Sequence, residues 1–214
     1  MYYKSLKLEI SEKIALVTLS QPNKYNSMIP IFWKEIIEVF NKIENSNARV
    51  AIINAEGKHF SSGIDLDEFS SLGLTEGRDI GRKAENIRKI IKELQKSFNV
   101  IENSRIPVIA AIHGACIGGA VDLISACDIR YGTTDSFFSI HEVNIGMVAD
   151  VGTLQRLPNL IPLGLIKELA FTGRKMYSEE ALKSGLLNEI YTDKDQLINS
   201  VYKIARDISY KSPL

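Results

Sequence analysis

Short apolar runs that suit buried strands alternate with longer amphipathic stretches, and this alternation limits the possible folds more than any other feature. Val50 to Ile53 and Val108 to Ile112 are continuous apolar runs, as in strands covered on both faces. Between them, from about Asp79 to Glu102, apolar residues recur at helical spacing among many lysines and glutamates. Strands that alternate with helices in this way predict an α/β fold with parallel strand pairing.

The rest of the chain adds further predicted strands and helices. Leu6 to Ile10 and Ile14 to Leu19 flank a polar interruption and predict a hairpin, and Ser27 is expected to cap a helix from about Pro30. Further strands are expected at about 129–131 and 136–139, and further helices at about 120–126, 165–170, 178–182 (capped by Ser178) and 197–208.

Composition narrows the classes of partner. The 214 residues suit one domain spanning 1–214, with 26 basic and 26 acidic side chains in balance. No overall positive field favours nucleic acid or an anionic membrane, so small molecules or other protein chains are the expected partners. No stretch is apolar enough to span a bilayer, and no clear targeting signal is visible.

Metal and disulfide chemistry are not expected. Cys116 and Cys127 lack the spacing of a zinc site or a disulfide framework, and both are predicted to be buried free thiols. The three histidines, His59, His113 and His141, are scattered without the spacing of helical metal ligands.

Two glycine-bearing turns could present unpaired backbone N–H groups to a ligand. One is Ser62-Gly63-Ile64-Asp65, and the other is Gly118-Gly119 at the start of a predicted helix. Amides directed at one point would form an oxyanion hole, and the helix dipole at the second turn favours negative charge. Glycine also serves purely steric needs in such turns, so each turn alone leaves both readings open.

Three acidic residues lie in apolar or small-residue surroundings after the second turn: Asp122, Glu142 and Asp150. A carboxyl group that is removed from water has a raised pKa and can exchange protons near neutral pH. N-capping or ion pairing is the alternative explanation for any single one of them.

Taken together, these segments strongly resemble the enoyl-CoA hydratase/isomerase (crotonase) superfamily. Residues 21–28 resemble its CoA-contacting loop, residues 59–66 its first oxyanion segment and residues 107–130 its second. Within the superfamily, residues 60–65, 121–123 and especially 142–158 are most similar to the dienoyl-CoA isomerases.

The resemblance implies a spiral of ββα units followed by C-terminal helices, and it assigns roles to individual residues. The N–H groups of Ile64 and Gly119 would hold the thioester oxygen, while Glu142, Asp150 and Asp122 would be the catalytic carboxyls. Further contacts to the substrate or its CoA portion are expected from Lys24, Asn26, Ser62, Gly63, Asp65, Leu66, Asp67 and Ala120.

The implied activity is isomerisation of 3,5-dienoyl-CoA to 2,4-dienoyl-CoA in fatty-acid β-oxidation. Glu142 would remove the C2 proton, Asp150 would deliver a proton to C6, and Asp122 would keep the site polar or orient its neighbours. The resemblance implies acyl-CoA as substrate, no metal or redox cofactor, a homotrimer or hexamer, and a mitochondrial or peroxisomal location.

The chain departs from the family pattern at its end, and two rival functions stay open. Relatives usually continue beyond Leu214 with helices that close the acyl pocket and the trimer, so the C-terminal helical region is expected to be short.

One rival function is that of an enoyl-CoA hydratase, although the hydratase pattern places a glutamate at the position of Asp122. The other is a truncated, inactive relative that serves as a subunit or binding protein.

Overall fold

The predicted N-terminal hairpin is present in the computed structural model, which describes residues 1–69 and 79–212. Strands β1 (Leu6–Ser11) and β2 (Ile14–Leu19) pair antiparallel, with Ser11 opposite Ile14. The two residues between them, Glu12 and Lys13, both have positive φ values, 49° and 65°. Two left-handed residues make the tight turn whose twist matches that of the flanking strands.

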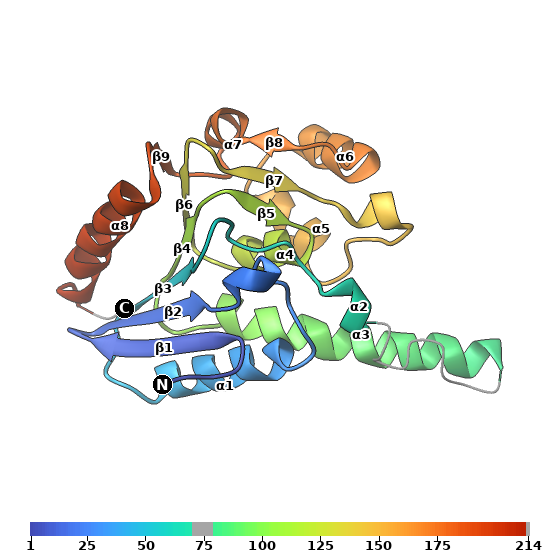
Figure 1. Cartoon of the computed structure of the whole chain (residues 1–214), viewed down its shortest axis with the longest axis horizontal. Coiled ribbons are helices and arrows are strands. Elements are labelled where there is room, and N and C mark those ends of the chain that lie inside the picture. Colours follow the sequence, from blue (N-terminus) through green and yellow to red (C-terminus); the bar gives the residue numbers. More distant parts are fainter. Residues whose placement is uncertain (70–78, 213–214) are drawn as a thin grey trace.

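The hairpin forms the edge of a six-stranded sheet of order β1-β2-β3-β4-β6-β9 (Figure 1). The added strands are β3 (Val50–Ala55), β4 (Val108–Ile112), β6 (Ile129–Thr133) and β9 (Glu189–Tyr191). Every pairing after the hairpin is parallel, as the alternating pattern predicted.

A second, three-stranded sheet lies beside the first and has the order β5-β7-β8. Its strands are β5 (Ala115–Ile117), β7 (Phe137–Ser139) and β8 (Met176–Tyr177). The chain therefore passes from β4 in one sheet to β5 in the other within three residues, and this step carries the His113–Gly119 segment to the junction of the sheets.

Helices cover the large sheet on both faces, and the alternation of side chains along the strands explains how. Val50 and Ile52 of β3 pack with α8 (Lys194–Ser209), whereas Ala51 and Ile53 face the larger core. That core also contains the apolar stripes of α1 (Phe32–Glu44) and α3 (Ile80–Glu102). Successive residues of a strand point to opposite faces, so a continuous apolar run is what a doubly covered strand requires.

The remaining helical segments connect these layers. They are η1 (Pro22–Lys24), α2 (Leu66–Phe69), α4 (Gly119–Ser125), η3 (Glu142–Ile145), α5 (Thr153–Arg156), η4 (Leu157–Asn159), α6 (Leu163–Thr172) and α7 (Ser178–Ser184). Among the described residues, no helix combines the length and apolar character that crossing a membrane requires.

Two predicted helix caps are wrong. The first helix begins at Phe32 without a side-chain cap, and the Ser27 hydroxyl instead donates to Asp65 at 2.9 Å. Ser178 is the first residue of α7, and its hydroxyl donates to the Thr134 carbonyl at 2.8 Å. In both cases a tertiary partner takes the hydroxyl that local sequence would assign to the helix.

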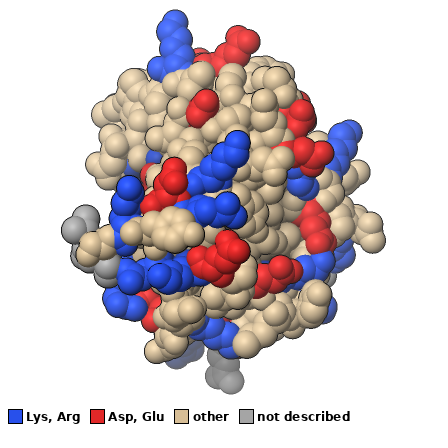
Figure 2. Space-filling model, turned by 90° about the vertical axis from the view of Figure 1, so that its left-hand side faces the viewer, with Lys and Arg blue, Asp and Glu red and all other residues tan. Residues whose placement is uncertain are grey.

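Among the described residues, those of helix α3 that are buried lie in one of its halves. Its buried residues are Leu94, Ser97, Phe98 and Ile101, all in the C-terminal half, while the N-terminal half projects from the body (Figure 1). Figure 2 shows basic and acidic side chains interspersed over another face, in keeping with their equal numbers.

Candidate functional site

The two predicted glycine turns lie against each other. Ser61 pairs with the second segment, because its N–H donates to the Ala115 carbonyl and its carbonyl accepts from Ile117. Gly63 has φ +86°, and a Cβ at this position would lie 2.5 Å from the Ile117 oxygen and 3.2 Å from the Gly119 nitrogen. Only glycine allows this approach, and it brings the two turns to one point.

The amides of Ile64 and Gly119 are unpaired at this junction. The residues on either side of Ile64 pair with Met28: the Met28 N–H donates to the Gly63 carbonyl, and the Asp65 N–H donates to the Met28 carbonyl. This pairing does not use the N–H of Ile64 itself. Gly119 is the first residue of α4, where an N–H has no partner within its own helix. Within residues 1–69 and 79–212 neither amide has an acceptor, so both can donate to a ligand.

A pocket opens where these amides lie. The residues that line it come from both turns, from α2 and from the segment around η3, namely Ser62, Ile64, Leu66, Ile117, Gly118, Gly119, His141, Glu142, Ile145 and Met147. Its walls are mainly apolar, which suits an acyl chain next to a polar head.

Glu142 supplies the carboxyl group of this pocket. Its side chain is 8% exposed, and its Oε2 atom has no hydrogen-bond partner among the described residues. Burial raises its pKa, and the charge of Asp150 raises it further. A Cβ at Gly118 would lie 3.3 Å from the other carboxyl oxygen, so the carboxyl lies close to the start of α4.

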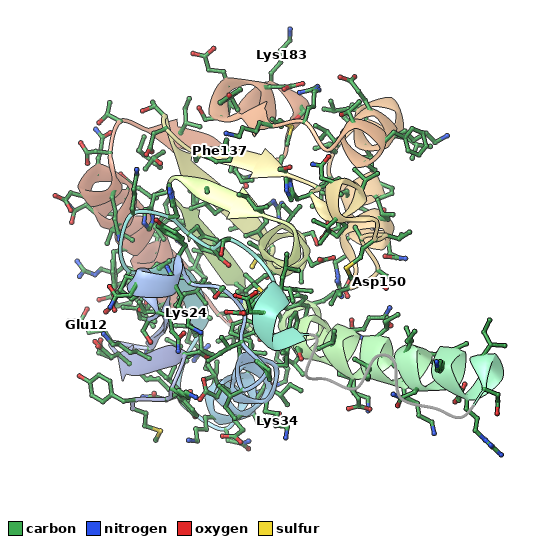
Figure 3. All side chains as sticks on the ribbon, turned by 45° about the vertical axis from the view of Figure 1, so that its right-hand side comes forward. Glu12, Lys24, Lys34, Phe137, Asp150 and Lys183 are labelled. Carbon is green, nitrogen blue, oxygen red and sulfur yellow. The ribbon has the colours of Figure 1, made fainter. Side chains whose placement is uncertain are left out.

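Asp150 lies on the loop between η3 and α5, next to α3 (Figure 3). It is half-buried, and burial raises its pKa. Asp150 does not line the pocket, although it is near enough to Glu142 to affect that carboxyl.

Asp122 is almost completely buried in α4, at 1% exposure. Burial raises its pKa to about 7 and Glu142 adds to the shift, whereas the Thr153 N–H, which donates to Oδ1 at 2.6 Å, and the Arg156 charge oppose it. Asp122 thus joins α4, which carries the Gly119 amide, to the loop that carries Asp150.

The residues predicted to contact the CoA portion lie around the same junction. Lys24 is half exposed and pairs with Asp65 at 3.6 Å. The Asn26 side chain accepts from Gln21 and donates to the Glu56 and His59 carbonyls, so it holds its loop against the first turn. Asp67 is exposed at the start of α2, and Ala120 is buried behind Gly119.

Several residues at the site had no sequence signal. Ile145 and Met147 line the pocket, but apolar side chains in an apolar stretch look like any other core positions. Arg156, beside the Asp150 loop, looked like part of a family motif without a role of its own.

The comparisons with known proteins agree on one family. The model described as "Enoyl-CoA hydratase/isomerase" matches residues 9–214. The chain is 50% identical to a Rattus norvegicus protein named "Delta(3,5)-Delta(2,4)-dienoyl-CoA isomerase, mitochondrial", over 99% of this chain and 66% of the relative. A peroxisomal protein of that name from Arabidopsis thaliana is 43% identical, over 99% and 78%.

A solved structure gives the same result for the fold. A protein from Legionella pneumophila described as a putative enoyl CoA hydratase/isomerase (crotonase) superposes with a TM-score of 0.88 at 28% identity, covering 98% of this chain and 78% of that one. The chain thus spans slightly less than two thirds of the rat relative's length and over three quarters of this structural neighbour.

Proposed function

The chain belongs to the enoyl-CoA hydratase/isomerase family and has its crotonase-like α/β fold, and on this premise we propose that it isomerises 3,5-dienoyl-CoA to 2,4-dienoyl-CoA. The observation that carries the proposal is one pocket that combines two unpaired amides with a buried carboxyl, with a second raised-pKa carboxyl nearby. A double-bond shift along a thioester needs these groups: a stabilised enolate oxygen, a base and an acid.

The amides of Ile64 and Gly119 are the proposed donors to the thioester oxygen. Removal of the C2 proton places negative charge on that oxygen, and donors that are fixed before the reaction stabilise it without reorganisation. One such donor typically lowers the barrier by about 3 kcal/mol. The proposal assigns activation of the thioester to these amides and therefore needs no cofactor.

The two carboxyls divide the proton transfer between them. Glu142 takes the proton from C2, which yields an enolate conjugated through C6, and Asp150 in its protonated form gives a proton to C6. The double bonds then lie at C2 and C4. The acyl chain covers Asp150, which is half-buried before binding, and loss of its remaining water raises its pKa further.

Repulsion between the carboxyls supports this division. The charge of Asp150 raises the pKa of Glu142, so ionising both at once is disfavoured. A pair that holds one proton has a base and an acid together near neutral pH. The proposed role of Asp122 is structural: it accepts a hydrogen bond from the Thr153 N–H and so fixes the loop that carries Asp150.

The CoA portion is proposed to lie along residues 21–28 and the first turn. Half-exposed Lys24 offers a cation for a phosphate, and Asn26 keeps the loop in place. Ser62 and Leu66 line the pocket between this loop and the catalytic carboxyls. Fatty-acid β-oxidation is the proposed setting, and a mitochondrion or peroxisome is the proposed compartment because the names of the rat and Arabidopsis relatives include these compartments.

The direct test is incubation with 3,5-dienoyl-CoA while the absorbance of the 2,4-dienoyl product is followed. Asp150→Asn keeps the size of the side chain but removes its transferable proton. We expect kcat to fall by about 100-fold to 10,000-fold, with acyl-CoA affinity by calorimetry nearly unchanged. Glu142→Gln should abolish the reaction as well, because no base is left at C2.

Asp195→Asn, in the first turn of the distant helix α8, is the matched control and should keep full activity. Full isomerisation by Asp150→Asn, or loss caused only by loss of binding, would remove Asp150 from the mechanism. Faster hydration of a 2-enoyl-CoA by the wild type would replace the proposal by the hydratase function.

A further inference from the structure

Arg156 is a buried guanidinium that touches both α3 and the loop carrying Asp150. Its side chain is 9% exposed, although it lines no part of the pocket that holds Glu142. On the α3 side, Nε and Nη2 donate to Glu102 at 3.1 and 2.9 Å, and Nη2 donates to Asn99 at 2.7 Å. On the loop side, Nη1 donates to the Val151 carbonyl at 3.3 Å.

Each residue from Asp150 to Thr153 has a hydrogen bond or a close packing contact with a neighbouring side chain. Gln95 of α3 donates to the Asp150 carbonyl at 2.7 Å, and Arg156 holds Val151. Gly152 has φ +133°, and a Cβ there would lie 1.7 Å from Nη1 of Arg156, so glycine makes room for the guanidinium. The Thr153 N–H donates to Asp122 at 2.6 Å.

The α3 contacts come from a single stripe of the helix. Gln95, Asn99 and Glu102 are spaced four and three residues apart, which places them on one face. This face lines a cleft together with Val151, Gly152 and Arg156. Figure 3 shows Asp150 directly beside this helix.

We propose that Arg156 is a positioning residue, which fixes the Asp150 carboxyl relative to Glu142 by clamping the Val151–Gly152 backbone to α3. This inference rests on the proposed function, because it takes Asp150 as the acid. Arg156 acts through the backbone, since its guanidinium donates to the Val151 carbonyl and packs against Gly152, and it does not line the pocket that holds Glu142.

A guanidinium suits this position because its donors point in several fixed directions from one plane. A lysine ammonium at the same position is a single point and cannot bond Glu102, Asn99 and Val151 together in that geometry. The ion pair between Arg156 and Glu102 contributes little to the stability of the fold, because Glu102 is 51% exposed and exposed ion pairs stabilise proteins weakly. The clamp function therefore accounts for the site better than a contribution to stability does.

The test is a double-mutant cycle of Arg156→Gln and Asp150→Asn in the full chain. Arg156→Gln alone is expected to lower kcat by about 10-fold to 100-fold, as for a misplaced catalytic group, with KM changed less than about threefold. In the Asp150→Asn background it should lower kcat little further, because the group that it positions no longer acts. A general structural defect would instead lower both backgrounds by the same factor, and that result would overturn the proposal.

Three further variants separate the possible outcomes. Arg156→Lys should rescue less than half of the lost activity. Asn99→Ala should reproduce a weaker form of the Arg156→Gln pattern, and it serves as the main variant if Arg156→Gln does not fold. Arg88→Gln removes an exposed ion pair with Glu85 on the same helix and should leave kcat unchanged.

A measurement without substrate keeps this inference distinct from the proposed function. Amide hydrogen exchange at Thr153 should become at least about 10-fold faster in Arg156→Gln than in the wild type or Arg88→Gln, because the loop loses its clamp. Wild-type protein that fails to isomerise 3,5-dienoyl-CoA refutes the proposed function alone. Unchanged Thr153 exchange in Arg156→Gln refutes the clamp, whatever the activity.

Discussion

The carboxyl of Asp122 has a pKa of about 7 because the fold removes it from water beside Glu142. The unfolded chain releases this proton near pH 4, whereas the folded chain keeps it up to about pH 7. Between these values the folded state binds the additional proton, so its stability falls as the pH rises. One such group contributes a slope of up to about 1.4 kcal/mol per pH unit.

Asp122→Asn removes this titration and keeps an oxygen that can accept from Thr153. We expect the free energy of unfolding of the variant, relative to the wild type, to increase from pH 4 to pH 7 and to level off above pH 8. Urea unfolding at pH 5 and pH 8, followed by the fluorescence of the single tryptophan, Trp33, measures this difference. An equal difference at the two pH values would contradict the assignment of the raised pKa to Asp122.

Individual residues of the site differed in how far the sequence could predict them. A carboxyl in an apolar stretch made Glu142, Asp150 and Asp122 candidates, and the family resemblance then gave them catalytic roles. The structure raises the pKa of all three. Arg156 could not be assigned in this way. Its partners lie about 55 residues away on α3, and no local pattern records such a contact.

At the level of elements, the two turns depend on each other through Gly63. An alanine there would require a left-handed conformation and would push its Cβ against the Ile117 carbonyl. We expect Gly63→Ala to displace the Ile64 amide and to lower kcat by about 100-fold or more, as for loss of one oxyanion donor.

Gly185→Ala is the matched control for backbone strain. Gly185 has φ +92°, close to that of Gly63, but lies at the end of α7. A Cβ there would lie 3.3 Å from the Leu160 carbonyl oxygen, the one close atom in the described part of the chain. It should lower the melting temperature while kcat stays near the wild-type value. Equal losses of kcat in the two variants would show that strain alone explains the effect.

The long elements were predictable, and so was the short strand β7, which was expected at about 136–139, whereas three other short strands were not. The strand predicted at Val108–Ile112 and the helix predicted at about 79–102 are both present as β4 and α3. Doubly covered strands and amphipathic helices have strong sequence patterns. Strands β5, β8 and β9 have only two or three residues each, too few for a period to emerge. They form because longer elements bring their backbones within bonding distance.

At the level of the whole molecule, apolar side chains remain exposed on two elements that contact each other, η3 and α6. Val143, Ile145, Leu163 and Phe171 are between 43% and 76% exposed. Apolar surface of this kind is typical of faces that bind another chain. We predict that the protein self-associates as a trimer or a pair of trimers.

Light scattering at micromolar concentration should therefore give a mass near three or six times that of the 23.9 kDa chain. Phe171→Glu should weaken the assembly, because it places a charge among these side chains. Lys183→Glu, which reverses the charge of a residue on the neighbouring helix α7, controls for the change in charge. A stable wild-type monomer would be the contrary result.

Glu142 is only 8% exposed, whereas Asp150 is half-buried and still contacts water. This difference in solvent exposure affects successive turnovers. In the proposed mechanism, each forward conversion ends with the proton on Glu142 and none on Asp150, the reverse of the state in which it began. Asp150 is then expected to take a proton from the solvent, so product formed in heavy water should gain deuterium at C6. The hydrogen taken from C2 stays longer on Glu142 and returns to C2 whenever an intermediate reverts. We therefore expect Glu142 to exchange the hydrogen that it took from the substrate slowly, while Asp150 takes each new proton directly from water.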